Sequence, residues 1–386
     1  MSRLDHVIHA ITPGDHFSPR TGSAIPTVVH GLAGAAAQDR REPGYRHSVA
    51  LGAGTWHPRY DSAAVIEFDE VAPPTRAGRL LDVARGRVGL PRAAAARYFA
   101  PQAAAIRAQS PSIVLAHNAP ALLPLLAGSR HRVVLYAHNN LFGTMTPGET
   151  ARTLRSAAAV VSVSDALAAE LRERMPAPMH PLVHVVGNGV DTRQFRPGER
   201  EAGERLRVLF VGRMIPEKGA DVLLDAVALL DRNDLEVLIV GSHGFDAGAA
   251  LTPFERGLRA RAAAVTTPVR FLPFEPRTAL PALLRSADLL VVPSRWAEPW
   301  ALTVGEGLAS GLPVVAARAG GIPDALAGAG ILVECEDAPA LAAAIARLAD
   351  DAELRRTMGA GARARAVERD WSWSWAQLRD VLDGLD

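Results

Sequence analysis

Two cationic residues stand in a short loop after a predicted strand. In VLFVGRMIPEKGADVLLDAV an apolar run ends at Gly212, Arg213 and Lys218 follow, and an amphipathic stretch begins after Gly219. Such a loop brings its side chains close to the first backbone N–H groups of the helix that follows. Cations and amides together bind anions through charge-assisted hydrogen bonds. The segment therefore predicts a phosphate site, although it lacks the GxxxxGK[ST] pattern of a Walker loop.

Two glutamates lie eight residues apart in SRWAEPWALTVGEGLASGLPVV. Glu298 precedes a predicted helix and Glu306 lies a little over two turns into it, so the two carboxylates cannot form a close pair that shares a proton. A carboxylate can accept hydrogen bonds from two hydroxyls, which suits a sugar or a ribose. We expect two separate hydroxyl contacts, with the first amides of the helix facing an anion.

Alternating strands and helices must position these residues. In the first half we expect strands at 4–11, 48–51, 64–68, 113–117, 133–137, 159–163 and 183–186, and helices at 25–37 and 165–174. In the second half we expect strands at 208–211, 236–240, 269–272, 289–292 and 313–316, and helices at 220–230, 277–285 and 302–309. Repeated βα units with short turns predict mostly parallel sheets with helices on both faces.

The predicted fold class is α/β, with two doubly wound domains facing each other across a cleft. The segment 187–207 loses its apolar period and collects charge, Gly and Pro, so we divide the chain there into domains at 1–190 and 191–370. Residues 371–386 form a third segment, a helix with enough apolar residues to pack back on the N-terminal domain. Ligands of open α/β sheets bind at the carboxyl ends of the strands.

Composition excludes several classes of protein. The 386 residues are 48% hydrophobic and 22% charged, as in ordinary globular proteins, and the net charge of +1 gives no global field for nucleic acid. The single cysteine, Cys335, forms no intrachain disulfide and no CxxC metal site. Asp5 and His6 lie where a secretory signal peptide would need an uninterrupted apolar segment, and no later stretch is apolar enough to span a membrane. We expect a cytoplasmic protein.

The combined motifs resemble the retaining glycosyltransferases of family GT4. Glu298, in EPWALTVGE, follows Arg213, in GRxxxEKG, by 85 residues, and GLPVVAARAGGIPD comes next; SVSDALAAEL and VGNGVD match more loosely upstream. The resemblance implies a GT-B fold of two Rossmann-like domains, the N-terminal one for the acceptor and the C-terminal one for the donor. It implies transfer, with retention, of a hexose-like sugar from a UDP- or GDP-type donor to a hydroxyl of a small-molecule, lipid-linked or polysaccharide acceptor.

The resemblance also assigns donor-side residues. In that family the residues matching Arg213 and Lys218 bind the donor's diphosphate, the one matching Glu298 holds sugar hydroxyls, and the one matching Glu306 holds the ribose. Main-chain amides contact sugar and phosphate at the positions of Trp300, Ala301, Leu302 and Thr303. The family commonly has Phe-Gly where this chain has Trp-Ala, which narrows the space beside the sugar.

Five further candidates follow other predicted strands or loops. His138 ends the strand in VVLYAH, where family members often carry a histidine facing the sugar, and we assign it a catalytic role with a satisfied structural histidine as the alternative. Gly22 resembles the family's glycine beside the diphosphate, and Phe274 could border the base or pack in the core. His117 and Asn118 are candidates for the acceptor, with structural roles as the alternative.

Other functions remain as alternatives. An oxidoreductase is disfavoured because the only GxGxx[GA] run, at 359–364, lies in a charged helical stretch and follows no strand. A metal-dependent transferase would normally carry an Asp-X-Asp triplet, and none occurs, so we expect no metal and no cofactor, with fixed cations in the metal's place. A sugar-nucleotide epimerase of the same fold and a non-catalytic sugar-nucleotide-binding protein stay open.

The segment from Arg76 to Arg107 is rich in arginine. It has seven arginines and one acidic residue, interleaved with apolar residues. The pattern is typical either of a solvated helical face or of a peripheral contact with an anionic membrane surface or an acidic acceptor.

Overall fold

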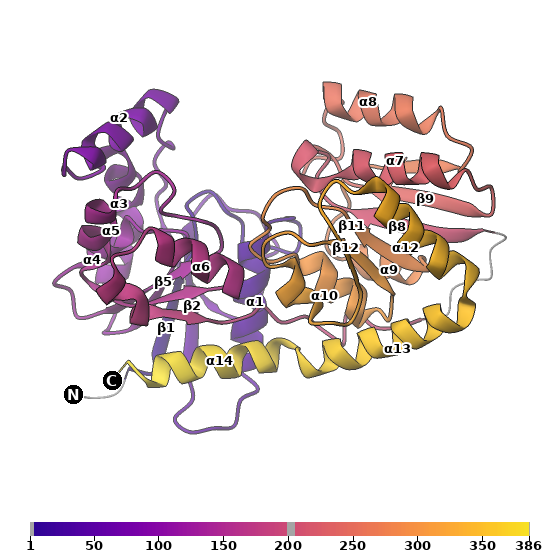
Figure 1. The fold of residues 1–386 in the computed structure, drawn as a ribbon. Helices are drawn as coiled ribbons and strands as arrows, with labels where there is room; N and C mark the ends of the chain where they lie inside the picture. Colours follow the sequence, from indigo (N-terminus) through magenta and orange to yellow (C-terminus); the bar gives the residue numbers. More distant parts are fainter. Residues whose placement is uncertain (1–3, 199–204, 386) are drawn as a thin grey trace. The chain divides into compact units, whose positions relative to one another are not determined.

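The computed structural model describes residues 4–198 and 205–385. The chain divides into two compact units. Unit 1 contains the chain up to Pro19, Ser23–Asn188 and the segment from Trp371 onward; unit 2 contains Arg20–Gly22 and Gly189–Asp370. The centre of the predicted linker, residues 199–204, lies outside the described residues. Each unit holds one parallel sheet covered by helices, which confirms the predicted α/β, Rossmann-like fold class (Figure 1).

Unit 1 holds a seven-stranded sheet in the order β3-β2-β1-β4-β5-β6-β7. Its strands are β1 (His6–Ala10), β2 (Arg46–Gly52), β3 (Ala64–Phe68), β4 (Ile113–His117), β5 (Arg132–Ala137), β6 (Ala157–Ser162) and β7 (Val183–Val185). Its helices are α1 (Ala24–Ala36), α2 (Arg76–Arg87), α3 (Ala93–Arg107), α4 (Leu122–Leu126), α5 (Pro147–Leu154), α6 (Asp165–Glu173), η1 (Ala177–Leu182) and α14 (Trp371–Asp383). The central strands are almost fully buried, as in parallel sheets covered on both faces.

The C-terminal helix α14 packs against α1 within unit 1. A Cβ atom on Gly31 of α1 would lie 2.2 Å from the ring of Trp371, so only glycine lets the two helices approach this closely. Further along α14, Trp375 is fully buried and its Nε1 donates a hydrogen bond of 2.8 Å to Asp39 Oδ2. The last helix is thereby part of the core of unit 1.

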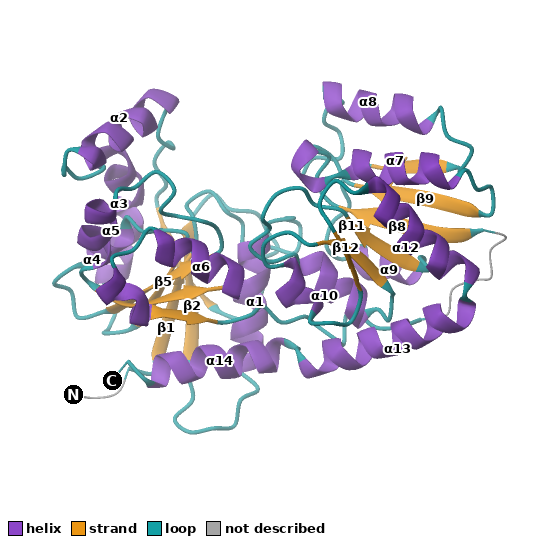
Figure 2. Ribbon diagram, viewed as in Figure 1, coloured by secondary structure: helices purple, strands orange, loops and turns teal. Residues whose placement is uncertain are grey.

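Unit 2 holds a six-stranded parallel sheet in the order β10-β9-β8-β11-β12-β13 (Figure 2). Its strands are β8 (Leu206–Val211), β9 (Leu235–Val240), β10 (Val269–Leu272), β11 (Leu289–Val292), β12 (Val314–Ala317) and β13 (Ile331–Val333). Its helices are η2 (Pro216–Lys218), α7 (Ala220–Leu230), α8 (Pro253–Ala262), α9 (Leu280–Arg285), α10 (Leu302–Ala309), α11 (Ile322–Leu326), α12 (Ala338–Asp350) and α13 (Ala352–Glu368).

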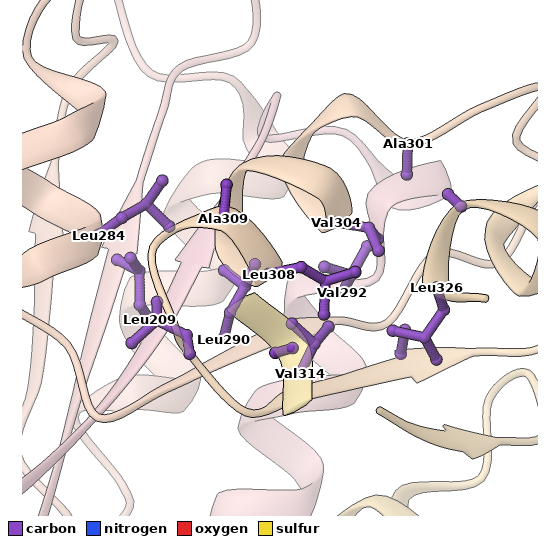
Figure 3. Packing of buried hydrophobic residues seen from close by; sticks show 14 of the residues in the cluster. Leu209, Leu284, Leu290, Val292, Ala301, Val304, Leu308, Ala309, Val314 and Leu326 are labelled. Carbon is purple, nitrogen blue, oxygen red and sulfur yellow. The ribbon is translucent and has the colours of Figure 1, made fainter. Parts of the chain in front are cut away.

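Two hydrophobic cores cover the two faces of this sheet. One contains α7 and α12, and the other contains α9, α10 and α11. Figure 3 shows the second core, where Val304 and Leu308 of α10 lie with Leu290 and Val314 of the sheet. A Cβ on Gly307 would lie 2.4 Å from the Leu290 side chain, so glycine brings α10 close to β11. This packing fixes the helix that carries Glu306.

Most of the predicted elements of unit 2 are confirmed, and one is corrected. The strands β10 and β11 and the helices α7 and α10 have the predicted bounds. The predicted helix at 277–285 begins only at Leu280, because Pro281 has no N–H and fits only the first turn of a helix. The GxGxx[GA] run lies inside α13, as predicted from its charged surroundings.

Candidate functional site

The loop between β8 and α7 carries the two predicted phosphate-binding cations. Lys218 ends the short helix η2, and Gly219 precedes α7 in a left-handed conformation with φ of +72°. A Cβ on Gly219 would lie 1.9 Å from the carbonyl oxygen of Pro293, so the position requires glycine on both counts. Arg213 is exposed, and its guanidinium makes no hydrogen bond or ion pair with the residues that the structure describes. Its charge is available to an anion.

Lys218 forms an ion pair with Glu298, which joins the two predicted motifs. Glu298 is only 5% exposed, and its Oε1 also accepts a hydrogen bond of 2.8 Å from Ser294 Oγ. The Glu298 backbone is held by the Gly320-Gly321 turn: Gly321 N–H donates to Glu298 O at 2.6 Å. A Cβ on Gly320 would lie 2.4 Å from the same oxygen. The buried carboxylate of Glu298 is thus fixed beside the Lys218 ammonium, in the loop between β11 and α10.

Glu306 forms a second buried pair of carboxylate and cation. It lies in α10, is 3% exposed, and pairs with Arg277. The Arg277 guanidinium carbon also lies 5.9 Å from the centre of the Phe195 ring. The sequence assigned Arg277 only to a helix, so this partner was missed.

The residues that open α10 combine a buried helix start with first-turn amides that receive no side-chain cap. Ala301 is the N-cap residue and is buried, whereas Trp300, Leu302 and Thr303 are half-buried. Alanine has no side-chain oxygen, so the N-cap residue accepts no side-chain hydrogen bond from the amides of the first turn. This is the arrangement expected for amides that bind an anion, and the role itself remains a prediction.

Phe274 and Gly22 lie together at another edge of unit 2. The Phe274 N–H donates to Ser242 Oγ at 3.0 Å, and its ring lies 5.6 Å from that of Phe245. A Cβ on Gly22 would lie 2.5 Å from the Phe245 ring and 3.0 Å from the Phe274 ring. The Gly22 backbone thus lies close to two aromatic rings, and its place beside a diphosphate stays a prediction.

His138 follows β5 in unit 1 and is 9% exposed. Its backbone N–H donates to Asn118 Oδ1 at 2.7 Å, and its Nε2 lies 2.8 Å from His117 Nδ1. Burial lowers the pKa of His138 to about 3, so the imidazole is neutral near neutral pH. A neutral imidazole can give or accept one hydrogen bond without adding charge.

His117 does not fit the predicted contact with an acceptor. It is fully buried, and its Nε2 lies 2.9 Å from His9 while its Nδ1 is bonded to His138. Neither nitrogen is left for a ligand. Asn118 is half-buried with φ of +51°, and its side chain holds the His138 backbone. Both residues support His138, which sequence spacing alone did not indicate.

The described residues contain neither a cluster suited to a metal ion nor a helix suited to a membrane. In residues 4–198 and 205–385, no group of three or more His, Cys, Asp or Glu side chains is arranged to hold a metal ion. Over the same ranges, no helix combines the length and apolar character needed to cross a membrane.

Comparison with known proteins matches both halves of the chain. The family model described as "Glycosyltransferase Family 4" matches residues 27–194, and "Glycosyl transferases group 1" matches 191–365. Proteins named D-inositol 3-phosphate glycosyltransferase are 38% identical over 224 residues in Corynebacterium glutamicum (strain R) and 38% over 199 residues in Salinispora arenicola (strain CNS-205). These matches cover 52% of each chain in the first case, and 46% of this chain and 44% of its relative in the second. This chain thus spans about half the length of the curated relatives it matches.

Solved structures share the fold over the whole chain. Sucrose-phosphate synthase from Thermosynechococcus elongatus has a TM-score of 0.74 at 19% identity, covering 99% of both chains. The Anabaena protein HepE, solved with UDP and glucose, has a TM-score of 0.66 at 19% identity and covers 99% of this chain and 100% of its own. Identities this low show the fold alone.

Proposed function

Because this chain belongs to the GT4-type glycosyltransferases of the GT-B fold, we propose that it moves a hexose-like sugar from a nucleoside diphosphate sugar to an acceptor hydroxyl, with retention at the anomeric carbon. The carrying observation is the paired arrangement in unit 2. Two buried carboxylates, Glu298 and Glu306, are each fixed by a cation, and Arg213 and Lys218 follow β8. This set offers acceptors for hydroxyls and positive charge for a diphosphate.

The main requirement of the reaction is to stabilise the departing diphosphate. When the bond from the sugar to the diphosphate breaks, negative charge grows on the phosphate oxygen, and Arg213, Lys218 and the first amides of α10 stabilise that charge. The departing oxygen can itself take the acceptor's proton if both lie on the same face of the sugar. Glu298 orients sugar hydroxyls and Glu306 the ribose, while His138 positions the sugar. Fixed cations serve in place of a metal, so the proposal includes no cofactor.

The choice of substrates rests on the relatives. HepE was solved with UDP and glucose, which supports a UDP-hexose as the first donor to test, with GDP-hexoses next. Several relatives are named D-inositol 3-phosphate glycosyltransferase, which supports a phosphorylated cyclic polyol as the first acceptor to test. Small-molecule scaffolds, lipid-linked sugars and polysaccharides follow as acceptors.

The test measures both products of transfer. The full chain is incubated with UDP-glucose and D-inositol 3-phosphate, and then with other donor and acceptor pairs. Nucleoside diphosphate release is followed together with the mass of the glycoside and the anomeric configuration of its new bond by NMR. We expect acceptor-dependent release and an unchanged configuration. Rapid conversion of the donor without acceptor would indicate the epimerase, and donor binding without turnover across the panel would indicate the sugar-nucleotide-binding protein.

We also propose a peripheral contact of a cytoplasmic enzyme with anionic lipid through α2. Leu80 and Leu81 are 65% and 62% exposed on this arginine-rich helix, where apolar side chains and cations together suit a lipid interface. Not every arginine is free for this contact, since Arg92 pairs with Glu149. Cosedimentation with vesicles containing anionic lipid should fall for Leu81→Glu, and equal sedimentation of both proteins would remove the proposal.

A further inference from the structure

Four histidines form one hydrogen-bonded row in unit 1, which we call the histidine chain: the half-buried His47, followed by the buried His9, His117 and His138. His47 Nδ1 lies 2.9 Å from His9 Nε2, His9 Nδ1 lies 2.9 Å from His117 Nε2, and His117 Nδ1 lies 2.8 Å from His138 Nε2. Neighbouring rings are stacked, with centroids 5.0 to 5.2 Å apart.

The strand register explains why these residues meet. Each histidine lies one strand over from the one before it and two residues closer to the carboxyl edge of the sheet. Side chains two residues apart on a strand point to the same face. The row therefore crosses one face of the sheet diagonally, from β2 through β1 and β4 to the residue that follows β5.

The tautomers of the four rings are coupled. Burial lowers the pKa of all four below the ordinary value, so each ring is neutral and carries one N–H. Three links use three of the four N–H groups, and each link needs one donor and one acceptor. Without a break, all donors must point the same way. The fourth N–H then lies at one of the two ends, on His47 Nε2 or on His138 Nδ1.

The two ends have different surroundings. His47 Nε2 is buried and makes no hydrogen bond with any described residue. His138, at the other end, keeps some exposure, and the described residues offer no partner to its Nδ1. Among buried backbone groups, N–H donors without an acceptor are rarer than acceptors with an unused lone pair, and we apply the same preference to the ring nitrogens. We propose that all four rings carry their proton on Nδ1, so that His138 presents a fixed N–H donor at the carboxyl edge of unit 1.

This inference rests on the proposed function in one respect, the ligand of His138. A fixed Nδ1–H would donate to an oxygen of the donor sugar and could not accept a proton there, which makes His138 a positioning donor and not a general base. His117, His9 and His47 never touch substrate and are positioning residues, since each donates to the next ring in the chain. Hydrogen bonds in such a row polarise one another.

The direct test is the tautomeric state in the unliganded full chain. Long-range 1H-15N NMR on histidine-labelled protein distinguishes a protonated Nδ1 from a protonated Nε2, and single His→Gln variants assign the signals. We expect the four rings to be neutral and protonated on Nδ1. Protonation of His138 on Nε2, or a mixture at that ring, would overturn the proposal. The measurement needs no turnover, so it stands even if no glycosyl transfer is found.

A measurement of activity tests whether the other histidines of the histidine chain affect turnover through His138. His117→Leu removes the donor to His138 Nε2 and should lower kcat about tenfold with little change in the KM for the donor, the effect of one lost hydrogen bond. His117→Gln restores an N–H donor and should recover most of kcat.

The matched control is His6→Leu. His6 lies on the same strand as His9 but is not part of the histidine chain, and its ring is hydrogen-bonded to Ser112 and Ser48. It should melt at a lower temperature and keep kcat. Equal kcat in the wild type and His117→Leu, or loss in His117→Gln as severe as in His117→Leu, would contradict the positioning role.

Discussion

The buried histidines should make unit 1 sensitive to acid, and His47 allows the effect to be isolated. Burial lowers the pKa of His47 to about 3, whereas a histidine in the unfolded chain has a pKa of about 6.5. Above pH 6.5 both states are neutral and the group has no effect on stability. As the pH falls below 6.5, the unfolded chain binds a proton that the folded chain does not, so stability is lost until the pH reaches the folded pKa.

The size of the loss follows from the gap between the two pKa values. A pH of 5.0 is 1.5 units below the pKa of about 6.5 that histidine has in the unfolded chain. At about 1.36 kcal/mol per unit, the free energy of unfolding is therefore about 2 kcal/mol lower at pH 5.0 than at pH 7.5. His47→Phe removes the group and its proton. The variant is destabilised at every pH by the lost hydrogen bond, but its stability should fall by about 2 kcal/mol less than that of the wild type between pH 7.5 and 5.0.

The assay must report on unit 1 alone, because the chain has two units. Hydrogen exchange followed by mass spectrometry on peptides from β1 and β4, across a urea series at both pH values, gives the free energy of opening for that unit. His57→Gln, at an exposed position in the same unit, is the control. Equal pH dependence in the wild type and His47→Phe would refute the assignment of a neutral, buried ring, and His47→Gln serves if the phenylalanine variant does not fold.

Other predictions concern the donor site. Arg213→Ala and Lys218→Ala should each lower kcat/KM roughly 30- to 1000-fold, as expected for about 2–4 kcal/mol of lost diphosphate stabilisation, and near-normal values in both would exclude the phosphate site. By calorimetry, Glu306→Ala should weaken the donor and free nucleoside diphosphate alike, whereas Glu298→Ala should spare the free nucleotide; equal loss would reverse that assignment. Activity should survive EDTA, and full loss with recovery on Mg²⁺ would show a metal requirement. His138→Ala should lower kcat by about one or two powers of ten, with partial recovery in His138→Asn, which keeps a donor.

The motifs around β8 and α10 could be predicted because their signals are local. A strand, a short loop with glycine and a helix follow one another within about twenty residues, so the bounds of α7 and α10 come directly from the apolar period. The ion pair of Lys218 with Glu298 could not be predicted in the same way. Its partners are 80 residues apart, and their meeting depends on β8 and β11 being neighbours in the sheet.

The hydrogen-bonded histidines beside His138 could not be predicted from the sequence, for a related reason. His9 is a polar residue inside a predicted apolar strand and His47 directly precedes the next predicted strand, and those were the available signals. Whether such residues touch depends on the register between parallel strands, which is set by long connections and not by local spacing. The same reason applies to His117, whose burial could not be predicted: the burial of a residue at a strand end depends on the side chains that neighbouring strands place beside it.

The return of α14 to unit 1 has a consequence for the order in which the chain folds. Residues 371–383 leave the ribosome after all of unit 2, yet Trp375 belongs to the core of unit 1 and Trp371 packs against α1 at Gly31. Domains generally fold during synthesis from the N-terminus, at about 5–20 residues per second. Here the N-terminal sheet must wait, with the face of α1 around Gly31 uncovered, for roughly ten seconds or more while residues 189–370 are made. Unit 2 can complete its core first, so the later half of the chain is the earlier to mature.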